Sequence, residues 1–131
     1  PTSVKDDLAD TPQELGTSTT HISIIDAQGN AVALTSSIEH AFGSGIVSHG
    51  FLLNNELTDF SFQPTVGSRK VQNAVEPGKR PRSSMSPVLV FDEKGSLRLV
   101  AGSPGGERII PYVLKTIIGV LDWGLPLQKA I

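Results

Sequence analysis

The sequence contains no cysteine among its 131 residues, which excludes disulfide bonds, thiolate catalysis and cysteine-based zinc sites. It also lacks any apolar run as long as the roughly 20 residues of a membrane-spanning helix. Residues 1–18 have no apolar centre of the kind found in signal peptides, so an export signal would have to lie on another part of the gene product. The 13 glycines and 9 prolines are dispersed at turn positions, which is typical of a loop-rich globular protein.

A strong excess of either charge is absent as well, since 11 basic and 13 acidic residues give a net charge of −2. Nothing in this balance favours nucleic acid as a partner, and the short basic run at residues 79–82 is typical of a solvated loop. The three histidines, His21, His40 and His49, show no metal-ligand spacing and are predicted to be structural or solvent-facing. We therefore expect no metal and no cofactor.

The hydrophobic pattern predicts two β-hairpins. Residues 21–26 and 31–36 are β-type runs around a tight turn, and residues 88–91 and 97–101 form a second pair. The strand at residues 31–36 is nearly all apolar, which predicts burial on both of its faces. Residues 1–18 are polar and show no periodicity, so they are predicted to be a flexible arm.

One amphipathic helix is predicted after the second hairpin. Its apolar stripe consists of Ile109, Ile110, Val113, Leu114, Ile117, Ile118 and Leu121. Pro111 is tolerated only near the first turn, so the helix is predicted to start between Gly106 and Arg108. Gly124 fits a C-terminal cap, and Pro126 fits the first turn of another helix. Two hairpins and an apolar helix predict an α+β fold, with covering layers on other segments of the gene product.

Three loop segments carry residues suited to chemistry. The glycines within residues 102–106 follow a strand and precede a helix, where backbone N–H groups can stabilise an oxyanion. The adjacent hydroxyls of Ser83 and Ser84 can bind a carboxylate, and the amide and acid groups of residues 54–59 suit an ammonium. Each segment also has a structural interpretation, as a tight turn, a Ser-rich loop or a self-capped turn. Thr19 is by itself a β-forming residue.

The joint order of the motifs is more specific than any one of them. In chain order they are Thr-Thr-His-Ile-Ser-Ile-Ile-Asp, Gly-Asn-Ala-Val-Ala-Leu-Thr, Phe-Gly-Ser-Gly-Ile, Leu-Leu-Asn-Asn-Glu, Lys-Arg-Pro-Arg-Ser-Ser-Met-Ser-Pro and Gly-Ser-Pro-Gly-Gly. This series resembles the small subunit of the γ-glutamyltransferase (γ-glutamyltranspeptidase) family. The resemblance implies an α+β fold of the N-terminal-nucleophile hydrolase type, an αββα sandwich of which this chain holds only part. It also implies a boundary between residues 1–18, ahead of an autocleavage site, and residues 19–131, the N-terminal part of the small catalytic subunit.

The resemblance assigns the nucleophile to Thr19, freed by self-cleavage of the Ser18–Thr19 bond. A freed threonine can act as its own general base, because a neutral α-amine with a pKa near ~8 takes the hydroxyl proton. Ser37 falls where the family has a hydroxyl that orients the nucleophile. Gly105 and Gly106 fall at the family's oxyanion turn.

The same resemblance implies how a γ-glutamyl donor is bound. Ser83 and Ser84 would meet its α-carboxylate together with an Arg of the large subunit, and Glu39, Glu56 and Asp59 would meet its α-amine. Glu39 departs from the Asn of many members, and position 56 varies between Gln and Glu in the family. The balance between hydrolysis and transfer therefore stays open.

The implied activity is transfer of a γ-glutamyl group from glutathione or a related amide to water, an amino acid or a peptide, through an acyl-threonine intermediate. The implied partner is the large subunit of the same precursor, and bacterial members are usually periplasmic or secreted. A chain whose Ser18–Thr19 bond is intact is predicted to be inactive. Two alternatives remain: an acylase for cephalosporin side chains or polyglutamate, and a homologue that never matures and serves as a binding or structural domain.

Overall fold

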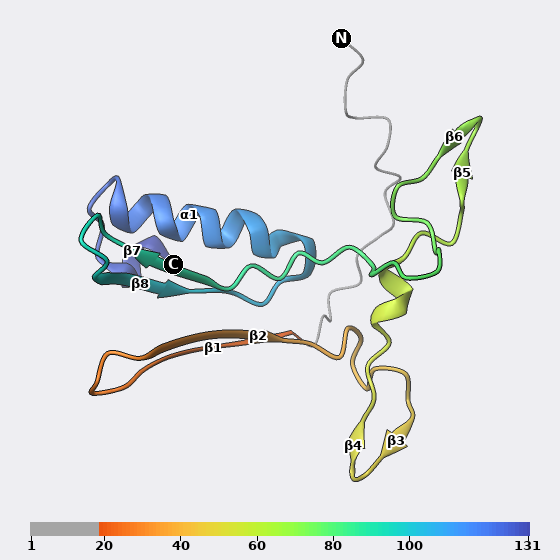
Figure 1. Cartoon of the computed structure of the whole chain (residues 1–131), viewed down its shortest axis with the longest axis horizontal. Helices are drawn as coiled ribbons and strands as arrows, with labels where there is room; N and C mark the ends of the chain where they lie inside the picture. Colours follow the sequence, from red (N-terminus) through yellow and green to blue (C-terminus); the bar gives the residue numbers. More distant parts are fainter. Residues whose placement is uncertain (1–18) are drawn as a thin grey trace.

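The computed structural model describes residues 19–131, so the flexible arm predicted for residues 1–18 lies outside the described residues. The hairpins of residues 20–36 and 88–101 lie over one another, and the helix of residues 109–121 covers the second of them (Figure 1). Short hairpins project from the end of the molecule that lies away from the turns of the two long hairpins (Figure 1). In chain order the elements are β1 (Thr20–Ile25), β2 (Ala31–Ser36), β3 (Val47–Ser48), β4 (Phe51–Leu52), η2 (Glu56–Asp59), β5 (Thr65–Val66), β6 (Arg69–Lys70), β7 (Val88–Phe91), β8 (Leu97–Ala101), η3 (Gly106–Arg108), α1 (Ile109–Leu121) and α2 (Leu127–Ala130). This mixed set agrees with the predicted α+β class.

The first hairpin forms where the sequence predicts it, with β1 and β2 paired antiparallel along their whole length. The Asp26 carboxylate fixes the turn, because its Oδ1 accepts the backbone N–H groups of Gln28 and Asn30 at 2.9 and 2.8 Å. The Asn30 side chain also donates to Asp26 Oδ2 at 2.7 Å, and this bond is the main reason that the pKa of Asp26 lies below its usual value.

The prediction that β2 is buried on both faces is wrong for this chain. One face of the hairpin carries Ile22, Ile24, Val32 and Leu34, whose side chains are 50% to 55% exposed. The opposite face carries smaller side chains such as Ala33 and is turned toward β7 and β8, which β2 contacts. Residues 19–131 supply a covering layer for one face only, and this is why the burial of β2 alternates.

The second hairpin and the long helix also form as predicted. A short 3-10 turn, η3, precedes α1, and Pro111 is the third residue of α1, where its missing N–H breaks no helical hydrogen bond. Gly124 has a φ of +63°, as a C-terminal cap requires, and α2 begins directly after Pro126. Within residues 19–131, no helix has both the length and the apolar character needed to cross a membrane.

The main buried core lies between α1 and β8. Its members are Leu99, Ala101, Ile109 and Val113. Two further buried residues, Phe60 and Ala74, lie at the base of the loop formed by residues 60–81. Ser61 forms a parallel β-bridge with Ala74 at the same place. The 60–81 loop is therefore anchored at its base, while its β5–β6 tip projects away from the hairpins (Figure 1).

Candidate functional site

The open end of the first hairpin brings two hydroxyl groups together. Thr19 directly precedes β1 and Ser37 directly follows β2, and the pairing of Thr20 with Ser36 places them opposite one another. The Thr19 hydroxyl donates to Ser37 Oγ at 3.1 Å, and both residues are half-buried. Ser37 Oγ also accepts the backbone N–H of Glu39 at 2.9 Å. The structure thus gives the Thr19 hydroxyl a hydroxyl neighbour at hydrogen-bond distance.

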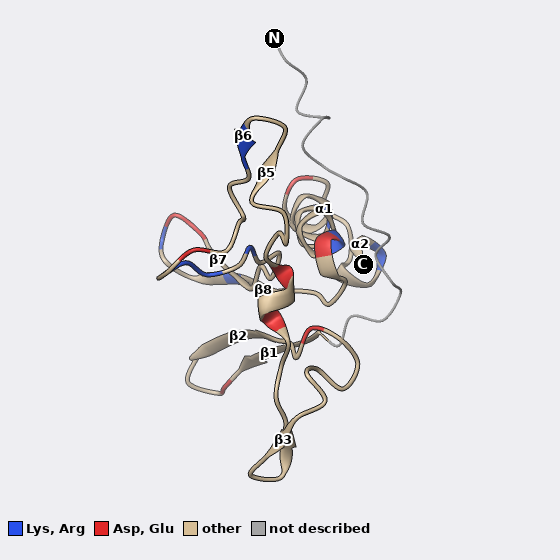
Figure 2. Cartoon of the chain, turned by 90° about the vertical axis from the view of Figure 1, so that its right-hand side faces the viewer, with Lys and Arg blue, Asp and Glu red and all other residues tan. Residues whose placement is uncertain are grey.

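Three carboxylates converge beside Ser37, and we call Glu39, Glu56 and Asp59 the acidic cluster. One oxygen of each lies within 4.8 Å of the others, and all three side chains are partly buried. Glu56 and Asp59 come from η2, which stands in red at the centre of Figure 2, whereas Glu39 comes from the turn after β2. The backbone of Glu39 has a φ of +69°, a left-handed conformation that is costly for a side chain other than Gly, Asn or Asp.

The acidic cluster holds its protons more tightly than ordinary carboxyl groups. Burial raises the pKa of Glu39, and the charges of Asp59 and Glu56 raise it further. Burial likewise raises the pKa of Glu56, with the Asp59 charge adding to it and the hydrogen bond from Ser37 opposing it. Burial raises the pKa of Asp59 too, although the nearby Arg82 guanidinium acts against this. Charge repulsion of this kind is relieved when a cation binds.

One oxygen of the acidic cluster lacks any partner among the described residues. Glu56 Oε1 is buried and accepts no hydrogen bond there. A buried acceptor without a donor is unfavourable, and an ammonium group brings both the donors and the positive charge that this cluster lacks. In residues 19–131 these carboxylates are also the one group of three or more ligand-type side chains whose oxygens lie close enough together to hold a metal ion.

Glu56→Gln is expected to raise the thermal unfolding midpoint of the full-length protein at pH 7. A carboxyl whose pKa is raised by folding binds its proton more tightly in the folded state. The free energy of unfolding therefore falls as the pH rises from the ordinary pKa of the carboxyl through its raised pKa in the folded state. The gain should shrink as the pH is lowered toward 4.5, the ordinary pKa of a Glu carboxyl, because the folded wild type, with its raised pKa, is already protonated before the unfolded chain is. Thermal melts at several pH values measure this difference.

Glu93→Gln serves as the matched control for this experiment, because Glu93 is exposed in the β7–β8 turn. Its melting profile should follow the wild type at each pH. If Glu56→Gln raised the unfolding midpoint equally at pH 7 and pH 4, or did not raise it at all, the negative charge of Glu56 would not be what destabilises the folded state.

The glycine turn between β8 and α1 lies at the same end of the molecule. Gly105 and Gly106 have φ values of +134° and +56°, so both backbones adopt conformations that favour glycine. Gly102, earlier in this turn, packs against the imidazole of His21: a Cβ placed on Gly102 would lie 2.1 Å from the ring. The turn is therefore held against β1, two residues after Thr19.

The histidine prediction holds for His21, which has a structural role. Its Nδ1 lies 2.8 Å from Thr35 Oγ1 and its Nε2 lies 3.0 Å from Ser23 Oγ, so both ring nitrogens are occupied. These contacts hold the ring beside Gly102 of the glycine turn. A sequence pattern could not reveal this role, because it depends on Gly102 having no side chain.

Ser83 and Ser84 lie on the extended segment that leads from the 60–81 loop to β7. Ser83 Oγ accepts the N–H of Met85 at 3.3 Å, and the Ser84 carbonyl accepts the Ser86 hydroxyl at 2.9 Å. Their neighbour Arg82 forms an ion pair with Glu107, at 2.5 Å, directly after Gly106. The pair shows that the segment carrying the two predicted serines lies beside the glycine turn.

Two asparagines join these segments: Asn55, which the sequence placed among the groups suited to an ammonium, and Asn73, to which it gave no role. Asn55 Oδ1 accepts the N–H of His40 at 3.0 Å, and its Nδ2 lies 2.7 Å from His40 Nδ1, so it connects η2 to the turn that carries Glu39. Asn73 connects the other end of η2 to Arg82. The predicted site residues thus form one connected region, in which hydroxyls, carboxylates and a glycine turn come from separate loops.

Comparison with known proteins gives consistent matches. The family model for gamma-glutamyltranspeptidase matches residues 2–131. The glutathione hydrolase proenzyme of Pseudomonas aeruginosa is 47% identical over 120 residues, which cover 86% of this chain and 21% of that protein. The solved gamma-glutamyltranspeptidase of Pseudomonas nitroreducens is 47% identical, with a TM-score of 0.75 over 86% of this chain and 61% of that one. An acivicin-inhibited gamma-glutamyltranspeptidase, for which autoprocessing and catalysis are described, is 44% identical with a TM-score of 0.73, over 86% of this chain and 63% of that one. The chain spans about a fifth of the length of the curated relatives it matches.

Proposed function

Since this chain belongs to the γ-glutamyltranspeptidase family, we propose that it supplies the nucleophile and most of the donor-binding groups of an enzyme that cleaves γ-glutamyl amides such as glutathione. The observation that carries the proposal is the contact of the Thr19 hydroxyl with Ser37, beside the acidic cluster. A nucleophile and a binding site for an amino-acid ammonium lie side by side. The relatives from Pseudomonas aeruginosa and Escherichia coli are described as glutathione hydrolase proenzymes.

In the proposed maturation, the Ser18–Thr19 bond of a longer precursor is cleaved. Residues 1–18 then end the large subunit, and residues 19–131 begin the small one. The large subunit supplies the remaining layers of an αββα sandwich of the N-terminal-nucleophile type. The half-exposed apolar face of the first hairpin supports this, because it offers a surface for a further layer. For location we propose the periplasm or the exterior of the cell.

The proposed reaction begins when the free α-amine of Thr19 takes the proton of the Thr19 hydroxyl. Oγ1 attacks the γ-carbonyl carbon of the donor, and the N–H groups of Gly105 and Gly106 stabilise the oxyanion. The C–N bond breaks, the amine leaves with the proton, and an acyl-threonine ester remains. Water or an amino acceptor then attacks the ester, returning the proton to Thr19 and releasing glutamate or a new γ-glutamyl amide.

We propose that the site binds both charged groups at the α-carbon of the donor, its α-ammonium and its α-carboxylate, which together we call the donor head. The acidic cluster binds the α-ammonium, which would satisfy Glu56 Oε1 and relieve the repulsion among the three carboxylates. Ser83 and Ser84 bind the α-carboxylate, together with an Arg of the large subunit. A chain in which the Ser18–Thr19 bond is intact lacks the α-amine base, so we propose that it is inactive.

The matured full-length protein is expected to prefer a γ-glutamyl anilide over a glutaryl anilide by at least about 100-fold in kcat/KM, because a site with partly buried, mutually repelling carboxylates rejects a donor that lacks the ammonium. Sequencing the N-terminus of the smaller polypeptide, with Thr expected first, tests maturation in the same preparation. A protein that cleaves itself but takes both anilides equally is an acylase of another kind. A protein that stays uncleaved on long incubation is a homologue without this activity.

A further inference from the structure

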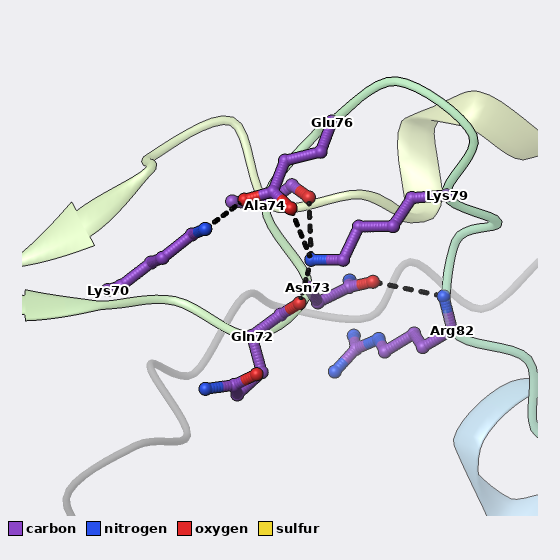
Figure 3. A network of polar contacts seen from close by, with 7 residues as sticks. All are labelled: Lys70, Gln72, Asn73, Ala74, Glu76, Lys79 and Arg82. Carbon is purple, nitrogen blue, oxygen red and sulfur yellow. Dashed lines mark hydrogen bonds and ion pairs between the residues drawn. The ribbon is translucent and has the colours of Figure 1, made fainter.

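Asn73 uses both polar atoms of its carboxamide to join two separate segments. Its Nδ2 donates to the backbone carbonyl of Asp59 at 2.6 Å, and its Oδ1 accepts the backbone N–H of Arg82 at 3.0 Å. Figure 3 shows the carboxamide pointing at the Arg82 nitrogen. Asp59 ends η2 and carries one carboxylate of the acidic cluster, whereas Arg82 directly precedes Ser83. One side chain therefore spans the two halves of the proposed donor-head site.

The position of Asn73 is itself fixed. Its backbone carbonyl accepts the N–H of Ser61 at 2.9 Å, and the next residue, Ala74, is buried against the base of the 60–81 loop. The Lys79 ammonium donates to the backbone carbonyls of Gln72 and Ala74, on either side of Asn73 (Figure 3). Because the backbone on both sides is held, the carboxamide acts from a rigid base.

A second link connects Arg82 to the glycine turn. The Arg82 guanidinium pairs with Glu107, but both side chains are more than half exposed. Exposed ion pairs contribute little, since water screens them and their side chains lose freedom. The hydrogen bonds of Asn73 are directional and reach backbone atoms, the one to the Asp59 carbonyl partly buried and the one from the Arg82 N–H exposed, so they define the position of this segment more closely than the ion pair does.

We infer that Asn73 is a positioning residue for donor specificity, which holds the Asp59 carboxylate and the Ser83–Ser84 hydroxyls at the separation of the two charges of an α-amino acid. This inference rests on the proposed function. Asn73 touches no reacting atom, so its loss weakens binding of the donor head in the ground state and the transition state alike. Such a loss raises KM and leaves kcat nearly unchanged.

The test compares the matured full-length wild type with Asn73→Ala, Asn73→Asp and Gln72→Ala. Asn73→Asp has the same shape and keeps the acceptor for Arg82, but it loses the donor to Asp59. Gln72 is an exposed neighbour that contributes its backbone carbonyl to Lys79, so Gln72→Ala is the matched control. KM and kcat for a γ-glutamyl anilide and a glutaryl anilide, and the affinity for free L-glutamate by calorimetry, are measured for each.

Asn73→Ala and Asn73→Asp are expected to raise KM for the γ-glutamyl anilide and to weaken L-glutamate binding by about tenfold, with kcat within about threefold of wild type. The preference for γ-glutamyl over glutaryl donors should fall in both variants, and Gln72→Ala should match the wild type. Unchanged KM, glutamate affinity and donor preference in Asn73→Asp would overturn the inference, as would an equal fall in kcat for both donors. A wild type that binds glutamate without cleaving the anilide would instead refute the proposed function, and the affinities would still test Asn73.

Discussion

Thr19→Ala in the full-length protein is expected to abolish both cleavage of the precursor and turnover of a γ-glutamyl anilide. The alanine keeps the backbone but removes the hydroxyl that donates to Ser37 at the end of β2. Without it no acyl-threonine ester can form, and loss of a covalent nucleophile costs at least about 10⁴-fold in kcat. A denaturing gel measures the cleavage, and release of the aniline measures turnover.

Thr20→Ala is the control for this variant. Thr20 is the adjacent threonine, it is exposed, and its hydroxyl makes a long 3.5 Å contact with the Ser36 carbonyl. Cleavage and turnover should survive this change. If Thr19→Ala were cleaved and active while Thr20→Ala were not, the nucleophile would have been assigned to the wrong residue.

Gly105→Ala is expected to lower kcat by about 10²- to 10³-fold, the usual effect of losing an oxyanion donor. The φ of +134° at Gly105 is a conformation that side chains rarely adopt, and an added Cβ would lie 3.0 Å from the ring of Tyr112. The turn must therefore change its backbone, which redirects the N–H groups at residues 105 and 106. Steady-state kinetics on the matured protein measure the effect.

Gly95→Ala separates this effect from simple backbone strain. Gly95 has a φ of +79° at the β7–β8 turn, and an added Cβ would meet no atom within 4 Å. It should lose some stability but keep its kcat. A similar kcat in Gly105→Ala and Gly95→Ala would remove the glycine turn from the proposed chemistry.

The regular elements could be predicted because local residues determine them. Asp26 and Gly29 form the first turn with their own neighbours, and the apolar stripe of α1 has the helical period whatever covers it. The burial of β2 could not be predicted in the same way. The sequence of an apolar strand shows which side chains would be stabilised by burial. Whether Val32 and Leu34 are in fact buried depends on which other segments pack against that face of the strand.

The candidate site likewise has a part that the sequence predicts and a part that depends on the rest of the molecule. The types of residue that can bind an ammonium or an oxyanion are visible in the sequence, and family resemblance assigned them positions. Their meeting in space depends on backbone-directed contacts, such as those of Asn73 with Asp59 and Arg82. A carboxamide in a loop has the same sequence signature whether it faces water or joins two segments. The left-handed backbone of Glu39, whose N–H donates to Ser37 Oγ, likewise has no signal in the sequence.

The apolar face of the first hairpin has a consequence for how such a protein is made. Ile22, Ile24, Val32 and Leu34 form a paired strip that water reaches, and an exposed strip of this kind favours aggregation between molecules. If the covering layer is on the same polypeptide, its local concentration reaches the millimolar range set by a short tether. Folding on one chain then outpaces encounters between chains. Under the proposed maturation, cleavage after folding would release the Thr19 amine only once this strip is covered, so the order of the two steps would protect the protein from aggregation as well as activate it.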